Sequence, residues 1–86
     1  MKKLEKLFKA FGNASRLKIL AYLKAHPASS VEQIAEGTKC SYKATSKHLG
    51  ILFSVELVDR EQAGYEMQYR LAISKSDPAH TLLELI

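Results

Sequence analysis

The sequence has one cysteine, two prolines and four glycines, and each shortage excludes a class of protein. A lone Cys40 cannot form a disulfide framework or a cysteine-rich zinc module. The few glycines and prolines argue against a disordered or low-complexity chain. No apolar run approaches the roughly 20 residues that span a membrane, and charged residues interrupt the N-terminal stretch that a signal peptide keeps apolar. We therefore expect a soluble cytoplasmic protein with one domain over residues 1–86.

Sequence patterns of catalytic sites are also missing. No nucleophile–base pair, glycine-rich phosphate loop or pair of carboxylates that would mark a cleft is evident in the sequence. We therefore expect that the protein is not an enzyme and that it carries no cofactor.

Basic charge is concentrated in the first half of the chain. Thirteen Lys and Arg against nine Asp and Glu give a net charge of +4. Residues 1–50 contain ten basic and three acidic side chains, or +7, whereas residues 51–86 contain three basic and six acidic ones, or −3. Such a chain can present one face to a polyanion, although a lysine-rich face that contacts only water has the same composition.

Apolar spacing and capping residues predict four helices before residue 54. Gly12 ends the first helix, Asn13 caps the second, and Ser30 with Gln33 forms a capping box for the third. Gly37 is expected to end that third helix. The four helices cover residues 2–11, 14–25, 31–36 and 41–53, and the last two form a candidate helix-turn-helix.

After residue 57 the apolar period changes from 3.6 to 2. Alternation predicts a strand from Tyr65 to Leu71 with one buried face, formed by Tyr65, Met67, Tyr69 and Leu71. Residues 57–62 are the expected partner strand, with Ala63-Gly64 at the turn of a β-hairpin. The fold class is therefore mainly α with a small β-hairpin.

The end of the chain predicts a fifth helix. A polar break at residues 74–76 precedes Asp77-Pro78, which suit the N-cap and first position of a helix over residues 77–86. The complete order is four helices, a two-stranded hairpin and a last helix, which is the plan of a winged helix-turn-helix.

Three segments resemble the ArsR/SmtB-type bacterial and archaeal transcriptional repressors. Residues 8–20 are similar to the opening helix of that family and its Pro-Thr-Arg-Leu-x-Ile-Leu segment, and residues 41–49 resemble its Ser-x-x-Thr-Val-Ser-Arg-His-Leu recognition helix. The third segment is Leu57-Val58 with the strand at Tyr69-Arg70-Leu71. This resemblance covers residues 4–73. It implies a homodimeric repressor that binds an inverted repeat of double-stranded DNA with helix 41–53 in the major groove.

The sequence departs from the family pattern at three places. Asn13-Ala14 stand where Asp-Pro is usual, and Glu56 stands where a glycine often ends the recognition helix. The third helix also lacks the Cys-x-Cys of arsenic- or lead-sensing members. The junction at Glu56 is therefore expected to be strained or differently shaped.

The chemistry of the fourth helix suits a DNA groove independently of that resemblance. Thr45, Leu49 and Leu52 form an inward stripe. The outward face has hydroxyls, one phenol and two lysines, which bind base edges and phosphates. Its members, with the N-terminal serine, are Ser41, Tyr42, Lys43, Ser46 and Lys47. An ordinary solvated helix face remains the alternative.

Four further residues are candidate DNA contacts. His48 either touches a phosphate or packs as a neutral side chain near the hairpin, and Arg16 either reaches the DNA backbone or forms a local ion pair. Arg60 and Gln62 lie in the wing, near its tip. Because Asp59, Glu61 and Glu66 dilute the positive charge there, we expect a weak contribution from the wing.

Apolar stripes at both ends of the chain predict a homodimer. A core this small leaves little room for both stripes, so pairing them across a two-fold axis would bury them and set two recognition helices about 34–36 Å apart. The residues are Leu4, Leu7, Phe8 and Phe11 in helix 2–11, and Leu82, Leu83, Leu85 and Ile86 in helix 77–86. The alternative is that both stripes pack within one monomer.

We expect no metal site. Asp77, His80 and Glu84 share a helix face, but their spacing differs from the zinc site of the resembling family, and Cys40 stands alone in its turn. A zinc-responsive regulator is still an alternative function. A winged-helix domain that binds proteins instead of DNA is another. A third alternative is peripheral membrane binding by helix 2–11. The sequence does not identify an inducer.

Overall fold

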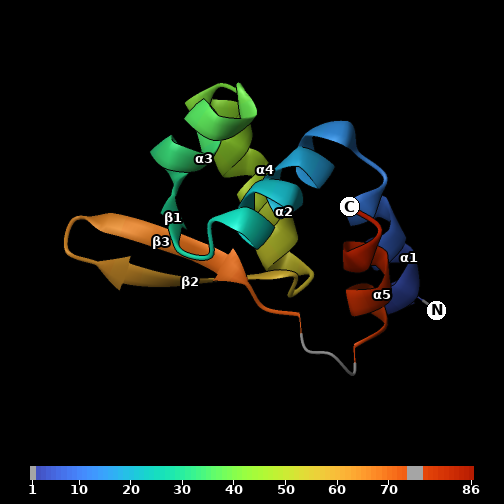
Figure 1. Cartoon of the computed structure of the whole chain (residues 1–86). Helices are drawn as coiled ribbons and strands as arrows, with labels where there is room; N and C mark the ends of the chain where they lie inside the picture. Colours follow the sequence, from blue (N-terminus) through green and yellow to red (C-terminus); the bar gives the residue numbers. More distant parts are fainter. Residues whose placement is uncertain (1, 74–76) are drawn as a thin grey trace.

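The computed structural model describes residues 2–73 and 77–86, and over these residues the chain forms five helices and a three-stranded antiparallel sheet (Figure 1). The expected order of four helices, hairpin and helix is confirmed. The helices are α1 (Lys2–Phe11), α2 (Ala14–Ala25), α3 (Val31–Thr38), α4 (Tyr42–Ser54) and α5 (Pro78–Glu84). The strands are β1 (Ser29–Ser30), β2 (Val58–Ala63) and β3 (Glu66–Leu71). The expected polar break at residues 74–76 lies outside the described residues.

Short polar side chains start the helices as the sequence predicts. The Asn13 side-chain oxygen accepts the Arg16 backbone N–H at 3.0 Å. Ser30 and Gln33 complete a capping box, with N···O distances of 2.9 and 3.2 Å. Asp77 accepts from the Ala79 N–H at 2.9 Å, so it caps α5. Each cap satisfies a backbone donor that the first helical turn leaves without a partner.

The core lies between α2, α3, α4 and the sheet. Its fully buried side chains come from all three helices, from the first residue of β2 and from the residue before it, and include Ile19, Leu20, Leu23, Ile34, Leu49, Leu52, Leu57 and Val58. Burying one such aliphatic side chain contributes about 1.5–3 kcal/mol, so this cluster holds the three helices together. In Figure 1, α1 and α5 lie at the end of the molecule opposite the tip of the hairpin. No helix among residues 2–73 and 77–86 is long and apolar enough to cross a membrane.

Glycine 37 does not end α3, contrary to the sequence prediction. The helix continues to Thr38, and Lys39 follows in the left-handed conformation with φ 57°. The glycine is needed for packing, because a Cβ at this position would overlap the ring of Tyr22 on α2. That ring stacks on His26 with its centroid 4.3 Å away.

The sheet differs from the predicted hairpin in the position of the turn and in the presence of a third strand. The turn is Gly64-Tyr65, with Gly64 at φ 66°, and the register pairs Ala63 with Glu66. Tyr65 is therefore fully exposed at the tip, so its predicted burial was wrong. Further along β3 the alternation holds only in part: Tyr69 is buried and Arg70 is exposed, but Gln68 is half-buried like Met67.

A third strand, β1, was not expected from the sequence. Ser29 and Ser30 pair with Tyr69 and Gln68 on β3, which gives the strand order β1-β3-β2. This short strand anchors the hairpin beside the start of α3, because Ser30 is also the N-cap of that helix.

Candidate nucleic-acid interface

The turn between α3 and α4 fixes where α4 begins. The Cys40 N–H donates to the Ala35 carbonyl at 3.0 Å across the left-handed Lys39, so the chain leaves α3 sharply. Ser41 then caps α4, with its hydroxyl accepting the Ala44 N–H at 3.1 Å. The candidate helix-turn-helix of the sequence is thus formed by α3, residues 39–41 and α4.

One face of α4 is anchored in the core. Thr45, Leu49 and Leu52 have no exposed surface, which confirms the inward stripe. These three residues recur at helical spacing and form one face of α4, whereas Ser46, Lys47 and Gly50 between them are exposed.

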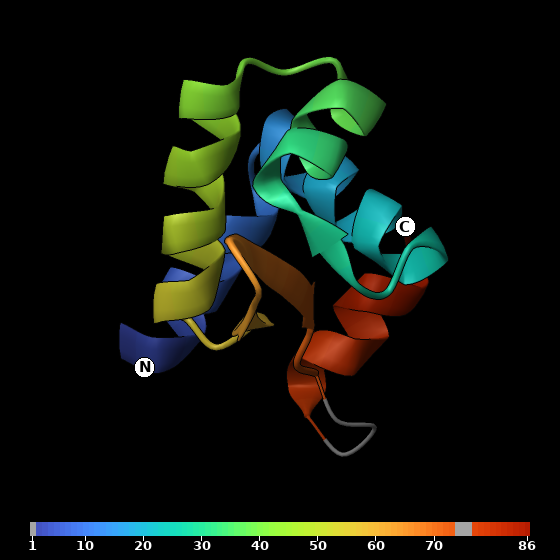
Figure 2. The same ribbon diagram turned by 90° about the vertical axis from the view of Figure 1, so that its left-hand side faces the viewer.

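The opposite face of α4 is exposed. Tyr42 is 62% exposed, and Ser41, Lys43, Ser46 and Lys47 are exposed as well. Figure 2 shows α4 at the edge of the molecule, on the left in that view, whereas α5 lies on the right. The expected face of hydroxyls, phenol and lysines is therefore uncovered in this chain.

Electrostatically, this face is free of acidic side chains, since residues 42–54 contain neither Asp nor Glu. A Cβ added at the exposed Gly50 would meet no atom of the described residues within 4 Å, so there is open space beside the helix. Lys39 is exposed in the turn just before α4 and adds a third lysine near its start. Lys39 was not among the predicted DNA contacts, although its spacing of four residues from Lys43 is visible in the sequence.

Arg16 and His48 come together between α1 and α4. Arg16 donates from Nε to the Ala10 carbonyl at 3.0 Å and from Nη2 to the Lys9 carbonyl at 2.9 Å. Its Nη1 lies 3.3 Å from Nδ1 of His48. Burial, the Arg16 guanidinium and the Lys47 ammonium together lower the pKa of His48 below its ordinary value of 6.5.

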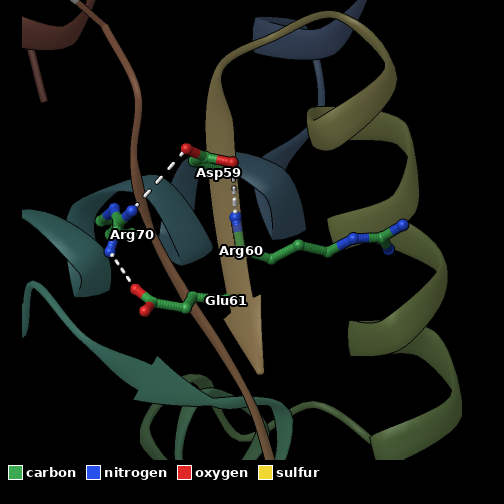
Figure 3. A network of polar contacts seen from close by, with 4 residues as sticks. All are labelled: Asp59, Arg60, Glu61 and Arg70. Carbon is green, nitrogen blue, oxygen red and sulfur yellow. Dashed lines mark hydrogen bonds and ion pairs between the residues drawn. The ribbon is translucent and has the colours of Figure 1, made fainter. Parts of the chain in front are cut away.

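The wing arginines are engaged within the hairpin and with α4 (Figure 3). Arg70 pairs with Glu61 at 3.0 Å and with Asp59 at 3.8 Å on one side of β2. Arg60 extends to the other side, and its guanidinium carbon lies 4.0 Å from the centroid of the Phe53 ring on α4. Arg60 is therefore at mid-strand, opposite Tyr69, and not beside the tip.

Gln62 lies closer to the tip of the wing. Its side-chain amide donates to the Gly64 carbonyl at 2.9 Å. Its exposed side chain helps to close the hairpin turn.

The terminal apolar stripes divide between core and surface. Phe11 and Leu83 are buried in the core, and Leu7 and Leu82 pack partly against it. The exposed members are Leu4, Phe8, Leu85 and Ile86. Each stripe thus has one part inside the monomer and another part that faces solvent.

Comparison with solved structures places this chain among winged helix-turn-helix regulators. The homodimeric DNA-binding domain (fragment 1–100) of Mb0332 from Mycobacterium bovis, a possible ArsR-family regulator, is 31% identical with a TM-score of 0.83. The match covers 98% of this chain and 74% of that one. The chain belongs to the ArsR family.

Two further relatives resemble this ArsR-family chain over 98% of its length. HlyU from Vibrio cholerae is 28% identical, with 87% of its chain covered and a TM-score of 0.82. The transcriptional repressor PagR of Bacillus anthracis is 26% identical, with 92% covered and a TM-score of 0.79. No protein-family model and no curated protein matches the sequence.

One departure of this ArsR-family chain from the family pattern is visible in its backbone. Glu56, which follows α4 where a glycine is common, adopts a left-handed conformation with φ 62°. A side chain is strained in that region, so the expected strain at this junction is confirmed.

The candidate metal ligands near α5 have contacts within the chain. Asp77 caps the helix, and Nδ1 of His80 lies 3.1 Å from a carboxylate oxygen of Glu84. Over residues 2–73 and 77–86, no three His, Cys, Asp or Glu side chains lie close enough to share a metal ion. Cys40 is half-buried, with its thiol 3.7 Å from the Thr38 carbonyl.

Proposed function

We propose that this ArsR-family chain is a transcriptional repressor that binds double-stranded DNA as a homodimer. In this proposal each protomer places α4 in the major groove of one half of an inverted repeat. The observation that carries the proposal is the exposed face of α4, which has hydroxyls, a phenol and lysines and no acidic side chain. The printed descriptions of Mb0332 as a homodimeric DNA-binding domain and of PagR as a repressor support it.

The residues of that face have different roles in the proposal. Tyr42 and Ser46 form hydrogen bonds with base edges, and Ser41 binds a phosphate at the start of the helix. Lys43 and Lys47 neutralise phosphates or bind guanine. Affinity then comes mainly from the lysines, whereas sequence preference comes from the complete face.

Among the other predicted contacts, Arg60 and Gln62 in the wing make smaller contributions in this proposal. Arg16 and His48 contact each other beside α4 and are given no DNA contact in it. The side chains of Arg60 and Gln62 already bind Phe53 and Gly64, and Arg70 is paired with two carboxylates. A weak wing is therefore part of the proposal.

Dimer formation uses the exposed apolar residues at the ends of the chain. Leu4 and Phe8 on α1 and Leu85 and Ile86 after α5 are exposed, and α1 and α5 lie at the end of the molecule opposite the wing tip (Figure 1). Large apolar side chains that gather on a surface favour association. We propose residues 1–86 as one domain that acts in the cytoplasm, with α1 and α5 as its dimer elements.

Selection from a random duplex library, followed by a salt titration, tests this function. The expected result is enrichment of an inverted repeat, and parallel selections with and without zinc test the metalloregulator alternative. If the selection enriches no sequence, that result contradicts the proposal and favours a protein-interaction domain.

Lys47→Ala tests the role of α4 in that binding. Loss of one phosphate contact is expected to weaken binding to all sequences and to reduce the slope of log K against log salt by about one unit. Lys47→Arg is the matched control, because it keeps the charge and should keep the slope. Unchanged affinity and slope in Lys47→Ala would exclude this role.

A further inference from the structure

One guanidinium connects the last turn of α1 to the middle of α4. Arg16, in the first turn of α2, binds the carbonyls of Lys9 and Ala10 at 2.9 and 3.0 Å and approaches Nδ1 of His48 at 3.3 Å. The last carbonyls of a helix have no partner within that helix, so these two contacts also close the C-terminal end of α1. Arg16 and His48 are both half-buried.

The chemistry of this contact requires arginine and a neutral histidine. A guanidinium only donates, so Nδ1 of His48 must accept and the ring proton must be on Nε2. A lysine ammonium is a single point of charge and lacks the planar fork that reaches two carbonyls and a ring at once. The lowered pKa of His48 agrees with a neutral, accepting ring.

The two helices that Arg16 connects have different tasks in the proposed function. α1 presents Leu4 and Phe8, which are part of the proposed dimer surface, whereas α4 presents the proposed DNA face. The angle between them therefore decides how far apart the two copies of α4 lie in a dimer.

We propose that Arg16 is a positioning residue that holds α4 relative to α1 through His48, and so sets the half-site spacing that the dimer accepts. This proposal rests on the proposed DNA-binding function. It differs from a direct phosphate contact by Arg16, which a lysine would largely replace.

Two measurements on the full chain separate these roles. The first compares wild-type protein and Arg16→Lys for binding to the selected inverted repeat, to versions with one or two base pairs added or removed between half-sites, and to a random duplex. Arg16→Lys is expected to lose about tenfold in affinity for the selected repeat, within the range for residues that couple two sites. Its preference for one spacing should flatten, while the random-duplex affinity and salt slope stay unchanged.

His48 provides the matched pair of variants. His48→Asn keeps an acceptor near the position of Nδ1 and should retain the spacing preference, whereas His48→Leu should lose it as Arg16→Lys does. Thermal unfolding and sedimentation on each variant establish that the fold and the dimer are intact.

The second measurement needs no DNA. A long-range ¹H–¹⁵N spectrum of the imidazoles is expected to show His48 with its proton on Nε2 in the wild type and a mixture of tautomers in Arg16→Lys. Identical imidazole spectra of the wild type and Arg16→Lys would overturn the proposed link between Arg16 and His48. A spacing preference that is unchanged in Arg16→Lys would also overturn it. A slope that falls by about one unit in Arg16→Gln but not in Arg16→Lys identifies a phosphate contact instead. A wild-type chain that selects no duplex overturns the proposed function, and the tautomer result distinguishes that outcome from failure of the Arg16 link.

Discussion

Single polar side chains determine where most helices of this chain begin. Asn13, Ser30, Ser41 and Asp77 each accept a backbone N–H two or three residues later. All four caps were predictable from the sequence, because donor and acceptor lie within one turn of each other. The contact between Arg16 and His48 was not, because 32 residues separate the two and only the packing of α2 on α4 brings them together.

Thr45 is a residue whose hydroxyl has no evident purpose in the core. It is fully buried, and within the described residues its Oγ1 has no hydrogen-bond partner. Thr45→Val removes this hydroxyl and keeps the β-branched shape, so it is expected to raise the free energy of unfolding by about 1 kcal/mol. Urea denaturation measures the change.

Thr38→Val is the matched control for that variant. Thr38 is also buried, but its hydroxyl donates to the Ile34 carbonyl at 2.7 Å, so its removal is expected to lower stability. A loss of stability in Thr45→Val as large as that in Thr38→Val would show that Thr45 also has a hydrogen bond.

The lowered pKa of His48 predicts a pH dependence of stability. As the pH falls below 6.5, His48 becomes protonated in the unfolded chain while it is still neutral in the folded chain. The free energy of unfolding should therefore decrease as the pH falls from 6.5 to the lower pKa of the folded state, and then level off. Urea denaturation between pH 8 and pH 5 is the measurement for wild type and His48→Gln.

Subtracting the two curves isolates His48 from the other titrating groups. His48→Gln lacks the titrating ring, so its stability should fall less over that pH range. Parallel curves for the two proteins would contradict the assigned pKa shift.

At the scale of elements, periodicity predicted the helices and the hairpin, whereas contacts between distant residues account for the errors. Ser29 and Ser30 form a strand only because β3 lies beside them, and two residues show no alternation. Gly37 was taken for a helix end, although its local role is to admit the Tyr22 ring. The turn was placed one residue early, and that shift moved Tyr65 from the expected core to the exposed tip.

The wing is expected to add stability but little DNA affinity. Arg60→Ala removes the contact with the Phe53 ring and should lower the free energy of unfolding by about 0.5–1 kcal/mol. The same variant should reduce the salt slope of DNA binding by less than about half a unit, since the cation is directed at α4. A reduction as large as that of Lys47→Ala would make the wing a principal contact.

At the scale of the whole molecule, the ends of the chain carry the proposed dimer surface. Phe8 is 53% exposed and Leu85 is 80% exposed. Phe11 and Leu83, which were also predicted to lie in the dimer surface, belong to the core instead. The sequence placed these residues on apolar stripes. It did not show how each stripe divides between core and surface, because that division depends on how α1 and α5 pack against the rest of the chain.

Phe8→Glu tests the dimer surface. Burying a Phe side chain contributes about 1.5–3 kcal/mol, so the dissociation constant of the dimer is expected to rise about tenfold or more. Sedimentation equilibrium measures it. Tyr65→Glu is the control, because it places the same charge on an exposed aromatic residue at the tip of the wing. Equal effects of the two substitutions would place the interface elsewhere.

In the proposed function the exposed face of α4 enters the major groove of DNA. Methylation interference on the selected inverted repeat tests it most directly, because the reagent marks guanine N7 in the major groove and adenine N3 in the minor groove. Guanine N7 methylation is expected to block binding at two positions about 34–36 Å apart, one for each protomer. Interference confined to adenine N3 in the minor groove would contradict it.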